Sequence, residues 1–223
     1  MGFNVNVMGP PGAGKGTQAT RFAAARSLPQ ISTGDMLREA VKLDDPVVLQ
    51  AKSRMDAGEL VDDATMIHIV RERLKRPDTA PGFVLDGFPR TVEQARALDV
   101  IMEERGNGPL IVIDVVVPED ELVRRLAARR ICQVCGTNAS PSATSSVCEK
   151  CGGTLVKRVD DNVGVVLERL KVYHRATRPV LEFYRGRPTF RVVDGAQTQA
   201  QVAAQFDAVV DEAAGVASRL EAL

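Results

Sequence analysis

Aromatic side chains are scarce in this sequence, and tryptophan is absent. Phe, Trp and Tyr make up 4% of the 223 residues. Proteins that bind single-stranded nucleic acid usually stack bases on such rings, so the composition argues against a base-stacking platform. Basic and acidic residues balance at 29 each, so no net charge attracts nucleic acid or an anionic membrane. We therefore expect no nucleic-acid partner and no membrane partner.

Long apolar runs are also missing. The best run, "LIVIDVVV" at 110–117, is interrupted by Asp114 and falls well short of the roughly 18 apolar residues of a transmembrane helix. Glycine and proline arrive too early at the N-terminus for a secretory signal, and Asn6 replaces the Ser or Thr of a myristoylation signal. We expect a cytoplasmic monomer, in whose reducing surroundings disulfides are unusual.

Five short apolar runs alternate with amphipathic helical patterns along the chain. The runs are "FNVNVMG", "LPQIS", "GFVLDGF", "LIVIDVVV" and "TFRVVDG". The helical patterns between them carry apolar residues near positions i, i+3 and i+4, and a last helix is expected over 198–223. This alternation predicts an α/β fold with a five-stranded parallel sheet between two layers of helices. Asn4 and Asn6 fit poorly in a first strand that is buried on both faces.

Two segments interrupt the alternation. Residues 32–61 open with "STGDMLREA" and read as a small helical insertion. Residues 130–160 shift towards Ser, Thr, Asn, Gly and Cys, and Val134 and Val147 are the only large aliphatics from Cys132 to Thr154. A segment of this composition builds no apolar core, so it is either disordered or held by a metal.

A glycine-rich loop follows the first predicted strand and opens the first predicted helix. It reads "GPPGAGKGT", from Gly9 to Thr17. Such loops direct backbone N–H groups and a helix N-terminus at phosphate, while the lysine, here Lys15, contacts the β- and γ-phosphates. Gly16 separates Lys15 from Thr17, whereas the strict pattern has the hydroxyl residue directly after the lysine. A nucleotide triphosphate site is the favoured interpretation, and a ligand-free glycine turn is the alternative.

All four cysteines lie in one C-x2-C-x12-C-x2-C pattern, at Cys132, Cys135, Cys148 and Cys151. Each pair precedes a glycine, as expected where a tight turn wraps backbone amides around thiolates. Four thiolates suit tetrahedral Zn²⁺ and leave no open coordination position, which predicts a structural metal. A redox pair, chance spacing, or an RNA-binding zinc ribbon are the alternatives; neutral charge and few aromatics oppose the last of these.

The motifs "GKGTQ", "STGDMLR" and "LDGFPRT", with arginine-rich stretches on both sides of the cysteines, resemble adenylate kinases in type and in order. The resemblance covers most of the chain and is closest to the long-lid, zinc-binding type of nucleoside monophosphate kinase. It implies a phosphate-loop core domain (1–31, 62–128 and 162–223), an AMP-binding insertion (32–61) and a lid (129–161). It also implies the Mg²⁺-dependent, reversible reaction of ATP with AMP to give two ADP.

The resemblance assigns residues to the two nucleotides. The ATP set is Gly12, Ala13, Gly14, Lys15, Gly16, Thr17, Arg125, Arg129 and Gln197. The AMP set is Thr33, Arg38, Glu59, Leu60, Val61, Gly87, Phe88, Pro89, Arg90, Gln94, Arg158 and Arg169. The catalytic residues are Lys15, Arg38, Arg90, Arg129, Arg158 and Arg169, with Asp86 beside Mg²⁺ and with Asp160 and Asp161 holding the closed lid.

Local sequence offers structural alternatives for several of these residues. Arg38 can be a solvated helix residue, and Thr91 with Gln94 has the spacing of a capping box, which would make the Gln94 amide structural. Glu121 can pair with Arg125 at one helical turn. Asp160 and Asp161 can form a solvated turn or cap the next helix.

Two alternative functions accompany the adenylate kinase prediction. A UMP, CMP or other monophosphate kinase is one, which Thr33 and Gln94 argue against. A nucleotide-binding switch without catalysis is the other, and the number of motif-placed arginines argues against it.

Overall fold

A computed structural model describes residues 2–42, 54, 56–139, 144–158 and 161–221. Five parallel strands form the central sheet, in the order β2-β3-β1-β4-β7. They are β1 (Phe3–Met8), β2 (Gln30–Ser32), β3 (Gly82–Asp86), β4 (Ile111–Val116) and β7 (Phe190–Asp194). The predicted five-stranded parallel α/β fold is confirmed, and each predicted apolar run contains one of the strands.

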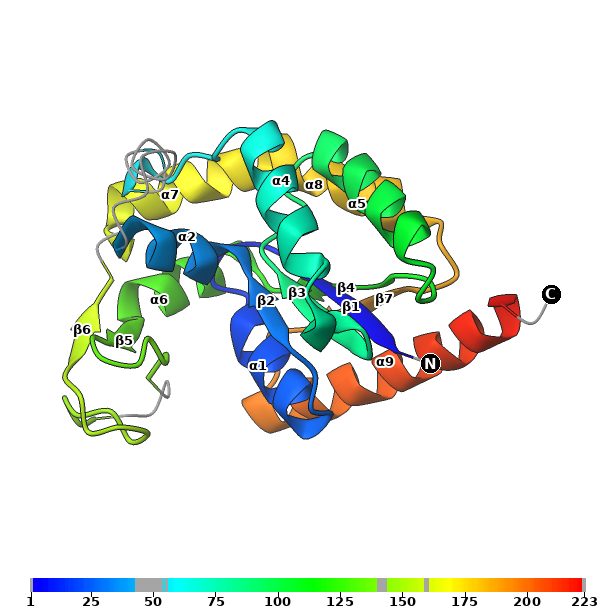
Figure 1. Ribbon diagram of the computed structural model, residues 1–223. Helices are drawn as coiled ribbons and strands as arrows, with labels where there is room; N and C mark the ends of the chain where they lie inside the picture. The colour runs from blue at the N-terminus through cyan, green and yellow to red at the C-terminus, as the bar shows by residue number, and fades with distance from the viewer. Residues whose placement is uncertain (1, 43–53, 55, 140–143, 159–160, 222–223) are drawn as a thin grey trace.

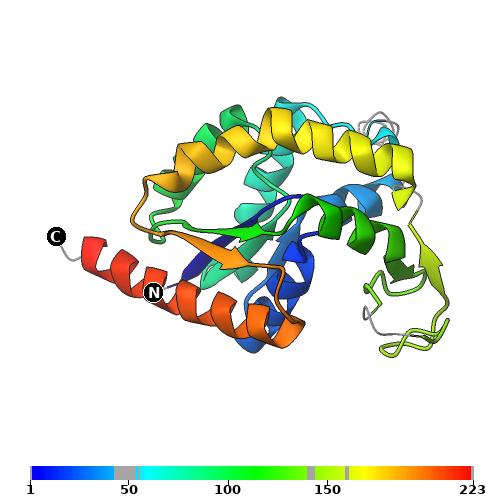
Figure 2. The ribbon, with the colours of Figure 1, turned by 180° about the vertical axis from the view of Figure 1, so that it is seen from behind.

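Helices cover both faces of this sheet (Figure 1). One face packs against α1 (Lys15–Ala25) and α9 (Gln199–Glu221), with α6 (Glu119–Ala128) and α7 (Val163–Val172) reaching the same core. The other face packs against α4 (Asp63–Leu74), α5 (Val92–Arg105) and α8 (Arg178–Arg185). The view from behind shows the continuous path of α7 and α8 over the sheet (Figure 2).

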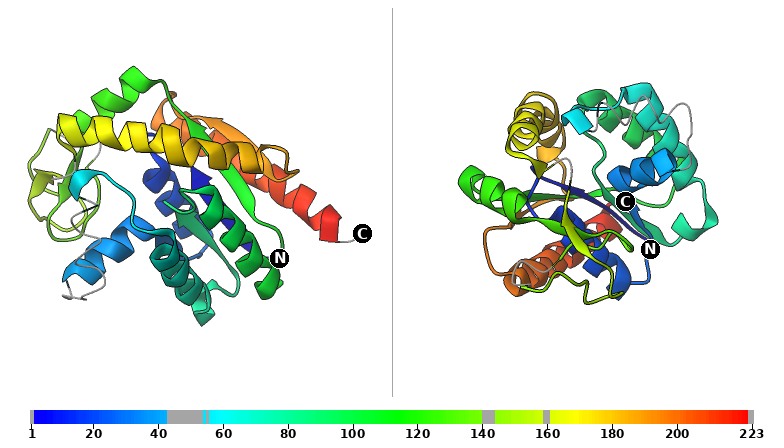
Figure 3. Two further views of the ribbon diagram at one scale, coloured as in Figure 1. Left: turned by 90° about the horizontal axis from the view of Figure 1, so that it is seen from above. Right: turned by 90° about the vertical axis from the view of Figure 1, so that its left-hand side faces the viewer.

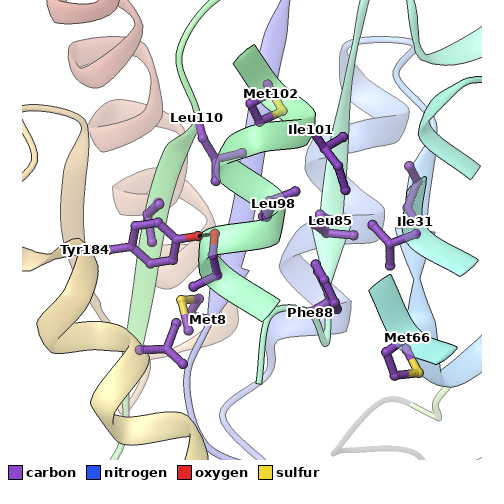
Figure 4. Close-up of a cluster of buried hydrophobic side chains, with 14 of the residues drawn as sticks. Met8, Ile31, Met66, Leu85, Phe88, Leu98, Ile101, Met102, Leu110 and Tyr184 are labelled. Atoms are coloured by element: carbon purple, nitrogen blue, oxygen red, sulfur yellow. Dashed lines mark hydrogen bonds between the residues drawn. The ribbon is translucent and has the colours of Figure 1, made fainter. Parts of the chain in front are cut away.

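The two faces have separate apolar cores because side chains alternate along each strand. Val5 and Val7 of β1 point into the core beneath α1 and α9, whereas Met8 points into the core beneath α5 and α8. Figure 4 shows this second core, in which Leu98 of α5 and Tyr184 of α8 lie over the sheet. These cores hold the carboxyl ends of β1 and β3 in place beneath the helices.

The two asparagines of β1 lie in the second core and are fully buried. The Asn4 amide nitrogen donates a hydrogen bond to the Asn107 carbonyl at 2.7 Å. Neither polar atom of the Asn6 side chain has a hydrogen-bond partner among the described residues. Asn6 pairs in register with Leu85 and Val112, so apolar strands flank it on both sides.

The connection between α7 and α8 is a π-helix, η3 (Tyr173–Thr177). The three segments follow one another without a break, so α7, η3 and α8 form one long rod across the molecule (Figure 3). A π-helix adds a residue to the turn and rotates the side chains that follow. No feature of the sequence predicted this turn.

The predicted insertion begins with α2 (Thr33–Lys42), directly after β2. Its later part, residues 43–53 and 55, lies outside the described residues. A short 3₁₀ turn, η1 (Pro77–Thr79), precedes β3. The cysteine segment carries a two-stranded antiparallel sheet of β5 (Arg130–Cys132) and β6 (Leu155–Lys157). Figure 1 places this small sheet at the end of the molecule opposite both chain termini.

Candidate active site and metal centre

The glycine-rich loop joins β1 to α1 at the carboxyl edge of the sheet. Gly12 and Gly14 have φ of 86° and 91°, values that favour glycine. The loop is closed by a hydrogen bond from the Ala13 N–H to the Pro10 carbonyl at 3.2 Å. Gly14 lies at the N-cap of α1, so the first turn of that helix directs its N–H groups towards the loop.

The structure gives a packing reason for a glycine at position 16, which the sequence alone did not reveal. A Cβ atom at this position would lie 3.2 Å from Oδ2 of Asp86, at the end of the neighbouring strand β3. The glycine between Lys15 and Thr17 therefore lets the Asp86 carboxylate approach the first turn of α1. This brings the predicted Mg²⁺-associated acid to the phosphate loop.

Lys15 lies among several cations. Its ammonium group donates a hydrogen bond to the Pro10 carbonyl at 2.8 Å. The Lys15 pKa is lowered to about 8, chiefly by burial; the Asp86 carboxylate opposes this shift, and the charges of Arg90, Arg169 and Arg129 add to it. Those three arginines come from the loop after β3, from α7 and from the end of α6. The fold thus gathers distant positive charges around one lysine.

A cavity of about 140 Å³ opens beside Lys15. Its walls come from β1, α2, the loop after β3, α5, α7 and η3. Besides Lys15, the cavity is lined by most of the predicted AMP-binding residues: Thr33, Glu59, Leu60, Val61, Gly87, Phe88, Pro89, Arg90, Gln94, Arg158 and Arg169. The side chain of Arg38 lies outside the described residues, although its backbone belongs to α2.

Hydrogen bonds fix the polar wall of this cavity. The Thr33 hydroxyl, 1% exposed, donates to the Gly87 carbonyl at 2.9 Å. Arg90 donates from Nε to the same carbonyl at 2.8 Å. The Ser32 hydroxyl accepts a hydrogen bond from the Asp35 N–H at 3.3 Å and so caps the start of α2.

Gln94 forms only half of the suggested capping box. The Thr91 hydroxyl accepts from the Gln94 N–H at 3.2 Å, as a capping residue does. The Gln94 side chain does not return to Thr91: its oxygen accepts from the Arg90 N–H at 2.8 Å. Its nitrogen donates to Asp63 Oδ1 at 2.7 Å. The side chain is therefore held at both ends while it lines the cavity.

Asp161 connects the two ends of the cysteine segment to the core. Its side chain is 2% exposed and accepts two hydrogen bonds from Arg129, each 2.6 Å long. It also accepts from Arg169 Nη1 at 3.1 Å. Arg129 ends α6 and Arg169 belongs to α7, so one carboxylate holds both arginines near Lys15. Asp160 lies outside the described residues.

Of the residues assigned to ATP, Lys15 lines the cavity, whereas Arg125 and Gln197 lie beyond both the cavity and the glycine-rich loop. Arg125 pairs with Glu121 at 2.6 Å, which is the structural alternative considered from the sequence. Gln197 is exposed in the loop after β7, where its amide donates to Asp194 at 3.3 Å. That loop nevertheless contacts the phosphate loop, because a Cβ at Gly195 would lie 3.2 Å from the Ala13 carbonyl oxygen. The roles of Arg125 and Gln197 in ATP binding stay predictions.

Several cavity residues were not predicted. Tyr173 and Thr177 reach the cavity from η3, and the Thr177 hydroxyl donates to the Arg90 carbonyl at 3.0 Å. Gly58 packs against α7, where a Cβ would lie 2.9 Å from the Arg169 side chain. The sequence carries no local signal for these contacts, because each joins segments far apart in the chain.

The four cysteine sulfurs lie within 4.8 Å of one another, and all four cysteines are free thiols. The Sγ atoms of Cys132 and Cys151 are 3.4 Å apart, and those of Cys135 and Cys148 are 3.7 Å apart. Tetrahedral Zn²⁺ with Zn–S bonds of about 2.3 Å requires sulfurs about 3.8 Å apart, so the spacing fits this metal. This is the only cluster of three or more such ligands among the described residues.

Local backbone geometry shapes the cysteine cluster. Gly136 and Gly152, which follow the two pairs, have φ of 69° and 74°. Each donates its N–H to the carbonyl of the first cysteine in its pair, at 3.0 and 2.8 Å. The apolar cluster here contains Cys132, Cys148 and Leu155, with Ala139 packed against it. The described part of the segment therefore has almost no apolar core apart from the cysteines themselves.

Comparison with known proteins decides the family. The sequence profile of the family described as "Adenylate kinase" matches residues 7–188. The chain belongs to the adenylate kinase family. It is a nucleoside monophosphate kinase, an ATP:AMP phosphotransferase, as the resemblance in the sequence implied.

Curated adenylate kinases match over nearly their whole length. One from Archaeoglobus fulgidus is 46% identical over 214 residues, covering 94% of this chain and 99% of that protein. One from Lysinibacillus sphaericus is 46% identical over 212 residues, covering 93% and 98%. One from Geobacillus sp. is 49% identical over 199 residues, covering 87% and 92%. Within the described part of this adenylate kinase, no helix is both long and apolar enough to cross a membrane.

Proposed function

We propose that the cavity beside Lys15 binds AMP, and that the glycine-rich loop binds the phosphates of ATP. The observation that carries this proposal is that Arg90 and Arg169 line the same cavity as Lys15, while Arg129 is held beside Arg169 on the Asp161 carboxylate. Phosphoryl transfer needs two phosphate groups in line and positive charge around the oxygens that are transferred. This cluster supplies that charge from preformed positions, which is the main source of stabilisation in such reactions.

Each part of the cluster has a separate task in this proposal. The loop N–H groups and Lys15 hold the β- and γ-phosphates of ATP, while Arg90 and Arg38 hold the AMP phosphate. Arg129, Arg158 and Arg169 surround the transferred group. Asp161 orients Arg129 and Arg169 through the contacts described above.

Base recognition is assigned to the inner wall of the cavity. Thr33, Gln94 and the backbone of residues 59–61 line it together. Arg125 and Gln197 are assigned to the ATP side, over the nucleotide and near its base. The chain divides into the core (1–31, 62–128 and 162–223), the AMP-binding insertion (32–61) and the lid (129–161).

Two metals belong to the proposal. Adenylate kinases use Mg²⁺ with ATP, and the Asp86 carboxylate and Thr17 hydroxyl beside the phosphate loop are oxygen ligands of the kind Mg²⁺ prefers. When bound, Mg²⁺ would supply further positive charge to the phosphates. Zn²⁺ on Cys132, Cys135, Cys148 and Cys151 holds the lid together and leaves no position for substrate. We further propose a cytoplasmic monomer without nucleic-acid or membrane partners.

The test is a coupled assay of ADP formation from ATP with AMP, GMP, CMP and UMP in turn. We expect rapid turnover with AMP only, and a loss of on the order of 10²-fold or more in kcat for Lys15→Met. Preference for UMP or CMP would show that the cavity binds another monophosphate. Near-normal turnover by Lys15→Met would overturn the assignment of the phosphate loop.

A further inference from the structure

Gln94 lines the cavity as a buried polar residue, with 1% of its surface exposed. It lies in the first turn of α5, and its amide is bonded at both ends. The oxygen accepts from the Arg90 N–H at 2.8 Å, and the nitrogen donates to Asp63 Oδ1 at 2.7 Å. Asp63 belongs to α4, so the contact joins two helices on the same face of the sheet.

These two partners permit one orientation of the amide. A backbone N–H can only donate, and a carboxylate can only accept. Turning the amide by 180° would place its NH₂ against the Arg90 N–H and its oxygen against the Asp63 carboxylate. Both hydrogen bonds would be replaced by repulsive contacts at a buried site, which is costly. The chemistry of the neighbours therefore determines which end of Gln94 is oxygen and which is nitrogen.

Asp63 is itself held in place. Its second oxygen accepts from the Thr91 hydroxyl at 2.9 Å, and that hydroxyl accepts from the Gln94 N–H. Thr91, Gln94 and Asp63 therefore form a closed ring of hydrogen bonds between the starts of α4 and α5. A ring of this kind fixes the position of the carboxylate as well as its charge.

The oriented amide keeps one acceptor and one donor for a ligand. Its oxygen has a second lone pair and its nitrogen a second hydrogen, and the described residues make no further bond to either. Adenine offers a matching pair, the donor N6–H and the acceptor N1. Guanine offers the reverse, the acceptor O6 and the donor N1–H. A Gln94 amide of fixed orientation therefore pairs with one purine and opposes the other.

We propose that Asp63 is a specificity-positioning residue, which makes the AMP cavity select adenine over guanine by fixing the orientation of the Gln94 amide. The inference rests on the proposed function, in which the base of the monophosphate lies against Gln94. Asp63 itself does not line the cavity and acts through Gln94.

The experiment compares kcat/KM for AMP and for GMP in the wild-type protein and in Asp63→Ala and Asp63→Asn. In Asp63→Ala only the Arg90 N–H still orients the amide, and we expect the AMP:GMP ratio to fall about tenfold through loss of one hydrogen bond to a charged group. Asp63→Asn keeps an acceptor oxygen and should recover most of the ratio. The KM for ATP should not change, because that nucleotide does not contact Gln94.

Asp62→Ala is the matched control for damage to α4. Asp62 is adjacent, and its side chain caps the same helix by accepting from the Thr65 N–H at 2.9 Å. We expect this variant to lose stability in a thermal melt without a change in the AMP:GMP ratio. An equal fall in the ratio for Asp62→Ala would assign the effect to the helix and overturn the proposal.

A double mutant separates this inference from the proposed function. If Asp63 acts through Gln94, then adding Asp63→Ala to Gln94→Ala should not change the ratio further. An unchanged ratio in Asp63→Ala, with the ratio lost in Gln94→Ala, would overturn the role of Asp63 alone. Failure of the wild-type protein to make ADP from AMP would overturn the proposed function together with this inference.

Discussion

At the scale of one residue, the environment of Lys15 shows why this cluster of cations favours an anionic ligand. Burial and the nearby arginines lower its pKa from 10.5 to about 8. Between these two values the folded protein binds fewer protons at this site than the unfolded chain does. The contribution of Lys15 to folding stability therefore rises with pH over that interval, opposite to a lysine that gains a carboxylate partner.

Binding of ATP should reverse this shift. At pH 8.5 the triphosphate is fully ionised, and its charge should raise the Lys15 pKa and draw most of one proton from the buffer. We expect calorimetry in buffers of different ionisation enthalpy to record this uptake, and ATP affinity to weaken as pH rises above about 8. Lys15→Met should take up no proton. Equal uptake by this variant would assign the titration to another group.

Asn6 is a second residue whose environment is testable. Its buried amide has no partner among the described residues, whereas Asn4 donates to the Asn107 carbonyl. Replacing an unpaired buried amide by an apolar group of similar size removes a desolvation cost of about 1–3 kcal/mol. We expect Asn6→Leu to raise the urea midpoint with little change in slope. Asn4→Leu, which also loses a hydrogen bond, should gain less; the reverse order would contradict this account.

Local motifs pointed to many of the residues that line the cavity but not to their hydrogen-bond partners, and the roles of these residues stay predictions. "GPPGAGKGT" and "DGFPR" specify a loop and an arginine at strand ends, because parallel strands direct such residues to one edge of the sheet. The partner of Gln94 was not predictable, because Asp63 lies 31 positions earlier and carries no motif of its own. Asn4 and Asn6 read as misfits in the sequence, and the structure explains only the Asn4 amide nitrogen, since Asn4 Oδ1 and both polar atoms of Asn6 have no partner among the described residues.

At the scale of elements, periodic patterns predicted helices and strands well, since each buries one face against the same sheet. The π-helix η3 was missed, although it brings Tyr173 and Thr177 to the cavity. A π-helix differs from an α-helix by one residue per turn, and composition does not distinguish the two. The clustering of the four cysteines, by contrast, was predictable from their spacing, and the lack of large aliphatics in that segment leaves a bound metal as the proposed source of its order.

Loss of one zinc ligand should therefore destabilise the lid without removing a catalytic group. We expect the purified protein to carry one Zn²⁺ per chain, and Cys132→Ser to lower the melting temperature. Initial rates well below the transition should survive far better in Cys132→Ser than in Arg129→Ala or Arg158→Ala. Elemental analysis, thermal melts and the coupled assay measure these three quantities.

Gln133→Ala is a suitable control for the zinc prediction. Gln133 is exposed beside Cys132; its backbone N–H donates to the Thr154 carbonyl at 3.0 Å, and its side chain makes no hydrogen bond to the described residues. This variant should keep both the metal and the melting temperature. A Cys132→Ser protein that keeps its stability but loses its rate would show that the zinc is catalytic.

At the scale of the whole molecule, the fold brings together residues that the sequence spreads over most of its length. Lys15 lies near the N-terminus, Arg90 follows the third strand, and Arg129 and Arg169 stand on either side of the cysteine segment. From the alternation of strands and helices, one expects the motif residues to meet at the carboxyl edge of a parallel sheet. The shape of the cavity and the ion pairs of Asp161 with Arg129 and Arg169 depend on packing between distant helices, which no local sequence pattern encodes.

The two edge strands of the sheet, β2 and β7, affect how readily copies of the protein associate. A sheet that is not closed leaves backbone groups at its margins, which can template strands of another copy and begin aggregation. The edge strand β2 is only three residues long. The other edge strand, β7, carries Arg191, whose guanidinium donates to the backbone carbonyls of Pro188 and Phe190. This strand ends at the exposed Asp194. Short length on one side and charge on the other disfavour intermolecular strand pairing.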